Sequence, residues 1–256
     1  MPLFYAITVA FLGFLLLALF EPMQFTYAAW LPGYEVADHR VHHVMIGATL
    51  TLLSVSIATQ LFRPAKRVGA YLLAAVIIGS IAAATIVGEG FAGLSELAIF
   101  IVPVALIGLL HPGIRSFRLS RERVDARMFA LAAVAAVPLF AFAALQLNLH
   151  LTLADEHVAF EHYIMMAGGT VAIGLGALVA SVRPVGWRFL AYGVAVLMVM
   201  VAAASMVFTD AAQGTNFGVA GGALAVLWAV AFVSVAEYDS RRRTGNSDRE
   251  PSETPA

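Results

Sequence analysis

The segments His42-His43-Val44-Met45 and His162-Tyr163-Ile164-Met165 begin two copies of one pattern. In each copy a His-x-x-Met motif is followed by an apolar run that ends at an Arg-Pro pair, Arg63-Pro64 in the first and Arg183-Pro184 in the second. The offset between the copies is 120 residues at both ends of the pattern. This agreement indicates an internal duplication, which predicts two equivalent apolar helices that each begin with a histidine.

The composition is that of a membrane protein. Hydrophobic residues make up 61% of the chain, charged residues 12%, and the mean hydropathy is +0.87. Soluble domains average about 45–50% apolar and about 25% charged residues. A helix needs roughly 20 apolar residues to cross a bilayer, and several runs reach that length. The run from Leu72 to Val87 has no period of two, which excludes a transmembrane β-barrel.

The apolar runs predict an all-α polytopic bundle of eight transmembrane helices. They lie near residues 3–20, 42–62, 68–88, 93–111, 128–147, 160–182, 187–208 and 217–236. Arginine and lysine are concentrated after the second, fourth, sixth and eighth runs, whereas the intervening loops are mainly acidic. The positive-inside rule therefore predicts a multi-pass protein of the cell membrane with both termini in the cytoplasm. The polar segment 238–256 is predicted to be a disordered cytoplasmic tail.

The duplication divides the chain into two parallel repeats of four helices, residues 1–114 and 115–237. Further matches support this division, since Ala70-Tyr71 corresponds to Ala191-Tyr192 and Glu89 to Asp210 when the offset becomes 121. Four crossings return the chain to its starting side. The two halves are therefore expected to be related by a pseudo-twofold axis along the membrane normal, with equivalent residues near that axis.

The first candidate site precedes and enters the second predicted helix. His39, His42 and His43 have the spacing i, i+3, i+4 and so share one face of a helical turn. Met45 follows His42 by one turn, at a deeper level in the membrane. The three histidines are expected at the outer surface, where this helix enters the bilayer.

The second candidate site is its counterpart at the sixth predicted helix. His157 and Glu161 are spaced i, i+4, and Met165 lies one turn below His162. The two sites hold five of the seven histidines of the chain at one predicted level. The duplication would bring them together near the axis.

These residue types favour a metal or a haem. The chain has no cysteine, so a metal must use histidine, methionine, carboxylate or carbonyl ligands. The positive ends of the two helix dipoles disfavour protonated imidazole, and neutral imidazole is the form that binds metal. We expect His42 and His162 as primary ligands and Met45 and Met165 as soft ligands, with His39, His43, His157 and Glu161 as alternates or as partners of the ligands. Histidine with methionine suits copper, and two histidines on facing helices suit haem.

Two families share part of these features. The run His39-Arg40-Val41-His42-His43 resembles the H-x-x-H-H box of membrane desaturases and hydroxylases, but those enzymes bind two irons through several such boxes and this chain has one. Eight helices in two halves with outer histidines also look like haem A synthase. The Glu-x-x-His pattern of that family is absent before His42 and His162, so the resemblance is limited to architecture.

The sequence leaves the reaction open, and no catalytic residue can be assigned from it. The leading hypothesis is a redox-associated protein that binds copper or haem and works beside a respiratory or redox membrane complex. The alternatives are a small transporter that conducts a cation or protons, and a structural subunit. A formal net charge of −1 without a basic patch gives no reason to expect nucleic acid as a partner.

Overall fold

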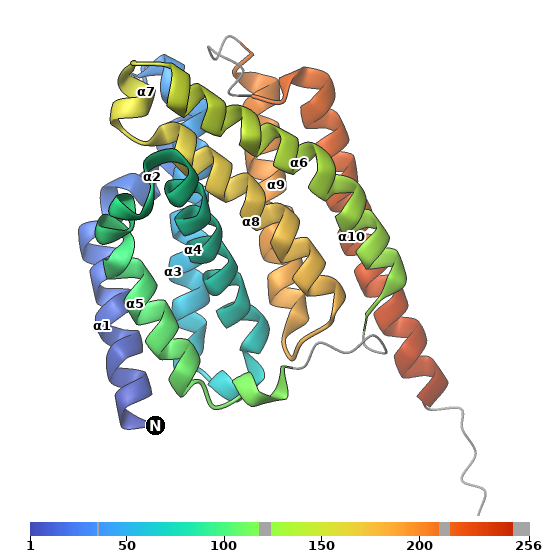
Figure 1. Cartoon of the computed structure of the whole chain (residues 1–256). Coiled ribbons are helices and arrows are strands. Elements are labelled where there is room, and N and C mark those ends of the chain that lie inside the picture. The colour runs from blue at the N-terminus through green and yellow to red at the C-terminus, as the bar shows by residue number, and fades with distance from the viewer. Residues whose placement is uncertain (35, 118–123, 210–215, 248–256) are drawn as a thin grey trace, which may run out of the picture.

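The computed structural model describes residues 1–34, 36–117, 124–209 and 216–247, and within these ranges the fold is helical without strands (Figure 1). Three-residue 3₁₀ helices occur in several connections, and one of them, Ala37–His39, leads into α3. The α-helices are α1 (Pro2–Ala18), α2 (Phe20–Ala28), α3 (Arg40–Ala58), α4 (Val68–Glu89), α5 (Leu94–Leu110), α6 (Ala126–Thr152), α7 (Glu156–Ala159), α8 (His162–Ser181), α9 (Trp187–Val207) and α10 (Gly218–Ser247).

Helices α3, α4, α8 and α9 form the centre of the bundle, and the long helices α1, α5, α6 and α10 surround them. Most of α3, α4, α8 and α9 is buried inside the protein, whereas most of α5, α6 and α10 is not. Large apolar side chains point outward from the peripheral helices, among them Leu17, Leu109 and Val137, which are 87%, 80% and 72% exposed. Apolar side chains inside and outside alike indicate a protein that spans a lipid bilayer.

Seven helices of the described residues are long and apolar enough to cross a membrane, and the pair α1 and α2 would make an eighth span if counted together. This pair is bent by 59° at Leu19: α1 matches the predicted first span within two residues, whereas α2 lies where the sequence predicts a loop. The bend lays α2 against α3. Gly47 allows this contact, because a side chain there would collide with Thr26, and the hydroxyl oxygens of Thr26 and Thr51 lie 3.1 Å apart.

Other boundaries also differ from the predicted ones. Helix α6 extends to Thr152, and the short helix α7 fills part of the expected loop before α8. Helix α10 continues to Ser247, past the start of the segment predicted to be disordered, because extending a nucleated helix costs little. The rest of that segment, 248–256, lies outside the described residues.

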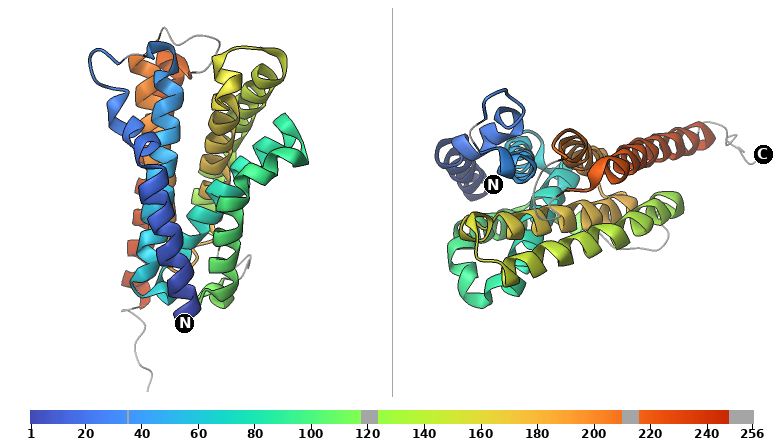
Figure 2. Two further views of the ribbon diagram at one scale, coloured as in Figure 1. Left: turned by 90° about the vertical axis from the view of Figure 1, so that its left-hand side faces the viewer. Right: turned by 90° about the horizontal axis from the view of Figure 1, so that it is seen from above.

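The two Arg-Pro corners have the same backbone conformation. Arg63 and Arg183 both have φ of 53°, in the left-handed region. The corners also approach each other, since the amide of Gly69 at the start of α4 donates to the carbonyl of Val185, with 2.8 Å between nitrogen and oxygen. These corners lie at the end of the bundle where α1 begins, and α3 and α8 start at the opposite end (Figures 1 and 2).

Candidate metal centre

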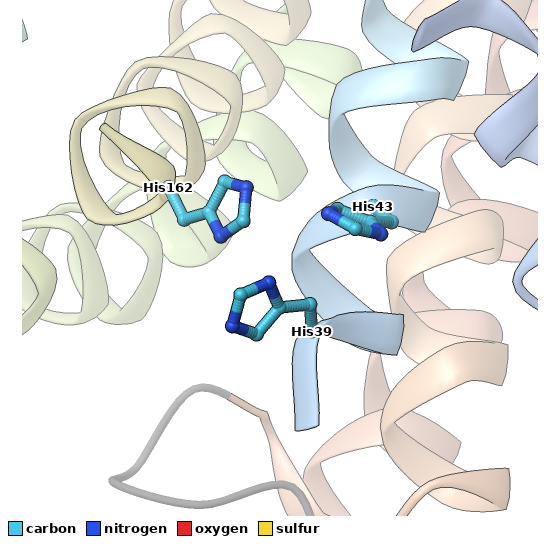
Figure 3. Close-up of side chains that lie close together, drawn as sticks. All are labelled: His39, His43 and His162. Atoms are coloured by element: carbon cyan, nitrogen blue, oxygen red, sulfur yellow. The ribbon is translucent and has the colours of Figure 1, made fainter. Parts of the chain in front are cut away.

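Five imidazoles meet where α3 and α8 begin. His39 ends the 3₁₀ helix before α3, and His42 and His43 lie in the first turn of α3. His157 belongs to α7, and His162 is the first residue of α8. The ring centroids of neighbouring pairs are 4.2 to 5.8 Å apart. Figure 3 shows the rings of His39 and His43 turned toward His162 from the opposite helix.

The five rings form two groups that share His162. One group is His39, His43 and His162, and the other is His42, His157 and His162. In each group the ligand nitrogens lie within 4.8 Å of one another. All five side chains are buried, and His42 is not exposed at all. Three converging neutral imidazoles are a ligand set that suits zinc, copper, iron or nickel.

Several ring nitrogens of this cluster are buried without a hydrogen-bond partner among the described residues. Both nitrogens of His42 are in this state, together with Nε2 of His157 and Nδ1 of His162. More than about 90% of buried polar groups in proteins have a partner, and leaving one without costs about 1–3 kcal/mol. A metal ion bound by lone pairs of these nitrogens would offset that cost.

The ring of His43 is held from the side of α2. Its Nδ1 is hydrogen-bonded to the phenol of Tyr34, and its face stacks on Phe25 at a centroid distance of 4.2 Å. Burial raises the pKa of Tyr34, with Arg40 acting in the opposite direction, so the phenol keeps its proton. When Nδ1–H of His43 donates to the phenol oxygen, the lone pair of Nε2 is left for a ligand.

Asp155 lies next to His157, the histidine of α7. Its carboxylate caps α7 by accepting from the amide of Val158, and its Oδ2 lies 3.6 Å from Nδ1 of His157. The hydroxyl of Tyr163 donates to the same oxygen over 3.1 Å. A carboxylate next to the outer nitrogen of a histidine fixes its tautomer and leaves the other nitrogen for metal, as at many metal sites.

The structure places Glu161 among other acids. It has φ of 56° and ends the turn before α8, which directs the chain from α7 into the helix. Burial, then the nearby Glu89 and Glu96, raise the pKa of its carboxyl. Glu161 belongs to neither group of metal-competent residues, although it adjoins His162 in sequence.

The two predicted methionine ligands lie in apolar contacts. The sulfur of Met45 accepts a hydrogen bond from Thr49 at 3.6 Å and packs against Gly169 of α8. Met165 is half-buried and packs on the core formed by α1, α3, α4 and their neighbours. Both methionines therefore contribute to helix packing in this arrangement, one turn below the imidazoles.

The remaining histidines are separate from the cluster. Nε2 of His150 lies 3.9 Å from a carboxylate oxygen of Glu89. At the other end of the bundle, Nδ1 of His111 accepts from the amide of Gly113, and its Nε2 lies 3.0 Å from the side-chain oxygen of Gln60. Both nitrogens of His111 thus have partners, which makes it a structural histidine.

Replacing His42 by leucine should stabilise the metal-free protein while it weakens metal binding. The substitution eliminates two buried nitrogens without partners and keeps an apolar side chain of similar size, so the free energy of unfolding should rise by about 1–3 kcal/mol. Thermal unfolding in detergent with a chelator present measures this change. The same substitution at His111 is the control and should destabilise the protein, because it leaves the amide of Gly113 and the side-chain oxygen of Gln60 without partners. A destabilised His42→Leu protein would contradict this account of the cluster.

The sequence did not reveal Tyr34 and Phe25 as parts of the site. Neither residue has a counterpart in the repeat pattern, and their positions depend on the bend before α2.

Comparison with models of protein families, with curated proteins and with solved structures finds no match to this chain. Function must therefore be inferred from the site itself, from its residue types, burial and geometry.

Proposed function

We propose that this protein is a multi-pass protein of the cell membrane that binds one copper ion through the five-histidine cluster. It would act in electron transfer or in delivery of copper to a respiratory or redox membrane complex. The observation that carries the proposal is the set of buried ring nitrogens without partners, converging from α3, α7 and α8. Copper fits because the affinity of a given nitrogen site among divalent first-row metals is highest for Cu²⁺.

Haem, the other cofactor suggested by the sequence, is less compatible with this geometry. A bis-histidine haem needs a macrocycle between its two imidazoles. The rings of His42 and His162 are nearly parallel, with centroids 5.5 Å apart and an angle of 20°. His157 contacts both rings, at 4.9 Å from His42 and 5.8 Å from His162, and occupies space that a porphyrin would require.

We further propose that the two halves, 1–114 and 115–237, are parallel repeats whose pseudo-twofold axis passes through the metal site. Residues on such an axis touch their own equivalents. At the repeat offset of 120, His162 contacts its equivalent His42, and Gly186 lies against Lys66. The matching φ of the two Arg-Pro corners supports the same relation.

The histidine end of the bundle would face the outside of the cell. The opposite end carries Arg63, Lys66 and Arg67 after α3 and Arg183 and Arg188 around the α8–α9 corner, whereas Asp38, Asp155 and Glu156 lie at the histidine end. The positive-inside rule then puts both termini in the cytoplasm. Copper would be bound on the extracytoplasmic side.

Metal analysis and spectroscopy of the detergent-purified protein test the proposed function. After incubation with copper and removal of excess, we expect one copper ion per chain and a Cu²⁺ electron paramagnetic resonance spectrum with imidazole nitrogen couplings. A Soret band in the absorbance spectrum would show that the bound cofactor is haem and not copper. Protein that retains neither copper nor another transition metal would refute the proposal.

Replacing Asp155 by asparagine should weaken copper binding by about 10–100-fold, the usual cost of losing a carboxylate next to a metal-bound histidine. Asparagine retains an oxygen that can cap α7, so the fold should remain. Competition with a chelator of known copper affinity measures the effect. Asp38→Asn is the matched control, because Asp38 precedes the other histidine segment but its side chain is exposed. Equal affinities for the two variants would argue against a positioning role of Asp155.

A further inference from the structure

A pocket of about 470 Å³ connects the surface to one edge of the histidine cluster. The residues that line it come from α2, the following loop and α3, namely Glu21, Phe25, Ala28, Leu31, Pro32, Gly33, Tyr34, Val36 and His43. His43 is the only one of the five clustered histidines in this lining. The pocket therefore meets the group His39, His43 and His162 at His43, and neither His42 nor His157 lines it.

The polar residues of the pocket are arranged for a cation. Glu21 is an exposed carboxylate on α2, whereas the phenol of Tyr34 contacts His43 at the edge of the cluster. The other side chains of the lining are apolar, except His43, and Gly33 contributes only its backbone. Among the described residues of the lining Glu21 is the charged one, and a carboxylate at the mouth of an apolar pocket attracts cations while the apolar walls exclude most other ligands.

The second group lies deeper. His42 has no exposed surface, and neither His42 nor His157 lines the pocket. His162 belongs to both groups. An ion held by the first group could reach the second by exchanging His39 and His43 for His42 and His157, while it stays bound to His162.

We propose that this pocket is the entry route for the metal ion, and that the ion is first held by His39, His43 and His162 and then passes to His42, His157 and His162. The inference depends on the proposed copper site and adds its direction of loading. Glu21 attracts the ion, and the contact between Tyr34 and His43 marks where the ion leaves the pocket and enters the cluster.

Filling the pocket tests the route. Ala28→Trp should slow copper loading of the metal-free protein by about tenfold or more, because the ion must then wait for the wall to open. The final stoichiometry should stay at one ion per chain, since Ala28 contributes no ligand. Tyr27→Trp is the matched control on the same helix, because Tyr27 is 58% exposed and is not part of the lining. Stopped-flow quenching of protein fluorescence by added copper measures both rates.

A second pair of variants keeps the test decisive if the tryptophan disturbs α2. Glu21→Gln should lower the loading rate about twofold at low salt and less at high salt, as expected for electrostatic attraction. Glu96→Gln, an acid at the same end but outside the pocket, should load at the rate of the unmodified protein.

The outcomes separate the two proposals. If the unmodified protein binds no metal, the proposed function fails. If it binds copper but Ala28→Trp and Glu21→Gln load at its rate, the copper site stands and the entry route is wrong. Two copper ions per chain at saturation would also overturn the inference, because the two groups would then be simultaneous sites and not successive positions of one ion.

Discussion

Replacing His42 and His162 together by alanine is expected to reduce bound copper from one ion per chain to background. The double variant removes one imidazole from the group of His39, His43 and His162, and two from the group of His42, His157 and His162. Neither group then retains three histidines. Because no cysteine is present to replace them, the remaining imidazoles cannot complete a site of comparable affinity. Metal analysis of the purified variant, together with its paramagnetic spectrum, measures the loss.

The single variants should differ in a way that a merely structural cluster would not produce. His162→Ala damages both groups, whereas His42→Ala leaves the group of His39, His43 and His162 intact. We therefore expect His162→Ala to weaken copper binding more than His42→Ala. His111→Ala is the control for general effects of losing a buried histidine, since His111 lies at the other end of the bundle and should leave copper binding unchanged. Full copper retention in the double variant would remove the site assignment.

The helical membrane architecture could be predicted because apolar length determines it. Most long runs of the sequence form helices within a few residues of their predicted positions, as α4 shows with 68–88 expected and Val68–Glu89 found, although α10 continues well past its predicted end. The repeat pattern also predicted that the histidines converge, and the rings of His42 and His162 lie 5.5 Å apart. The repeated pattern in the sequence thus predicted a contact between two segments that lie far apart in the chain.

Contacts that depend on exact helix register or on irregular segments could not be predicted. The spacing places Met45 one turn below His42, but in the structure the Met45 sulfur faces Thr49 and Gly169. Glu161 was expected on one helical face with His157, yet the left-handed residue between α7 and α8 breaks that face. The i, i+4 rule holds only inside a continuous helix, and no feature of the sequence marked the break.

The bend between α1 and α2 was the largest omission. The predicted span 3–20 ends where the bend occurs, and the polar residues that follow resemble a loop, so the sequence does not predict α2. The gain from packing α2 on α3 decides the outcome, through Gly47 and the contact between Thr26 and Thr51. Tertiary packing of this kind outweighs local preference, and it is what brings Tyr34 to His43.

The second large effect is expected for Asp125, which forms a buried ion pair with Arg183 at the end of the bundle opposite to the histidines. The Oδ2 and Nη2 atoms are 2.7 Å apart, and the side chains are only 3% and 9% exposed. Asp125→Asn should lower the free energy of unfolding by about 3–5 kcal/mol, because it leaves the guanidinium buried without its counter-charge. Asparagine also caps helices well, so the start of α6 should be preserved. Thermal and denaturant unfolding in detergent measure the change.

Two further variants separate the ion pair from other contributions of Asp125. Asp125→Ala should cost about 1 kcal/mol more than Asp125→Asn, since it also removes the cap that accepts from the amides of Arg127 and Met128. Glu237→Gln tests an ion pair of similar length, 2.6 Å to Arg188, whose arginine is 51% exposed. An exposed pair contributes about 0–1 kcal/mol, so this loss should be small. Equal losses for Glu237→Gln and Asp125→Asn would show that burial does not set the strength of the Asp125 pair.

Because this pair lies at the far end from the imidazoles, copper stoichiometry in folded Asp125→Asn protein should remain one ion per chain. That result would separate the stability of the bundle from the chemistry of its metal site.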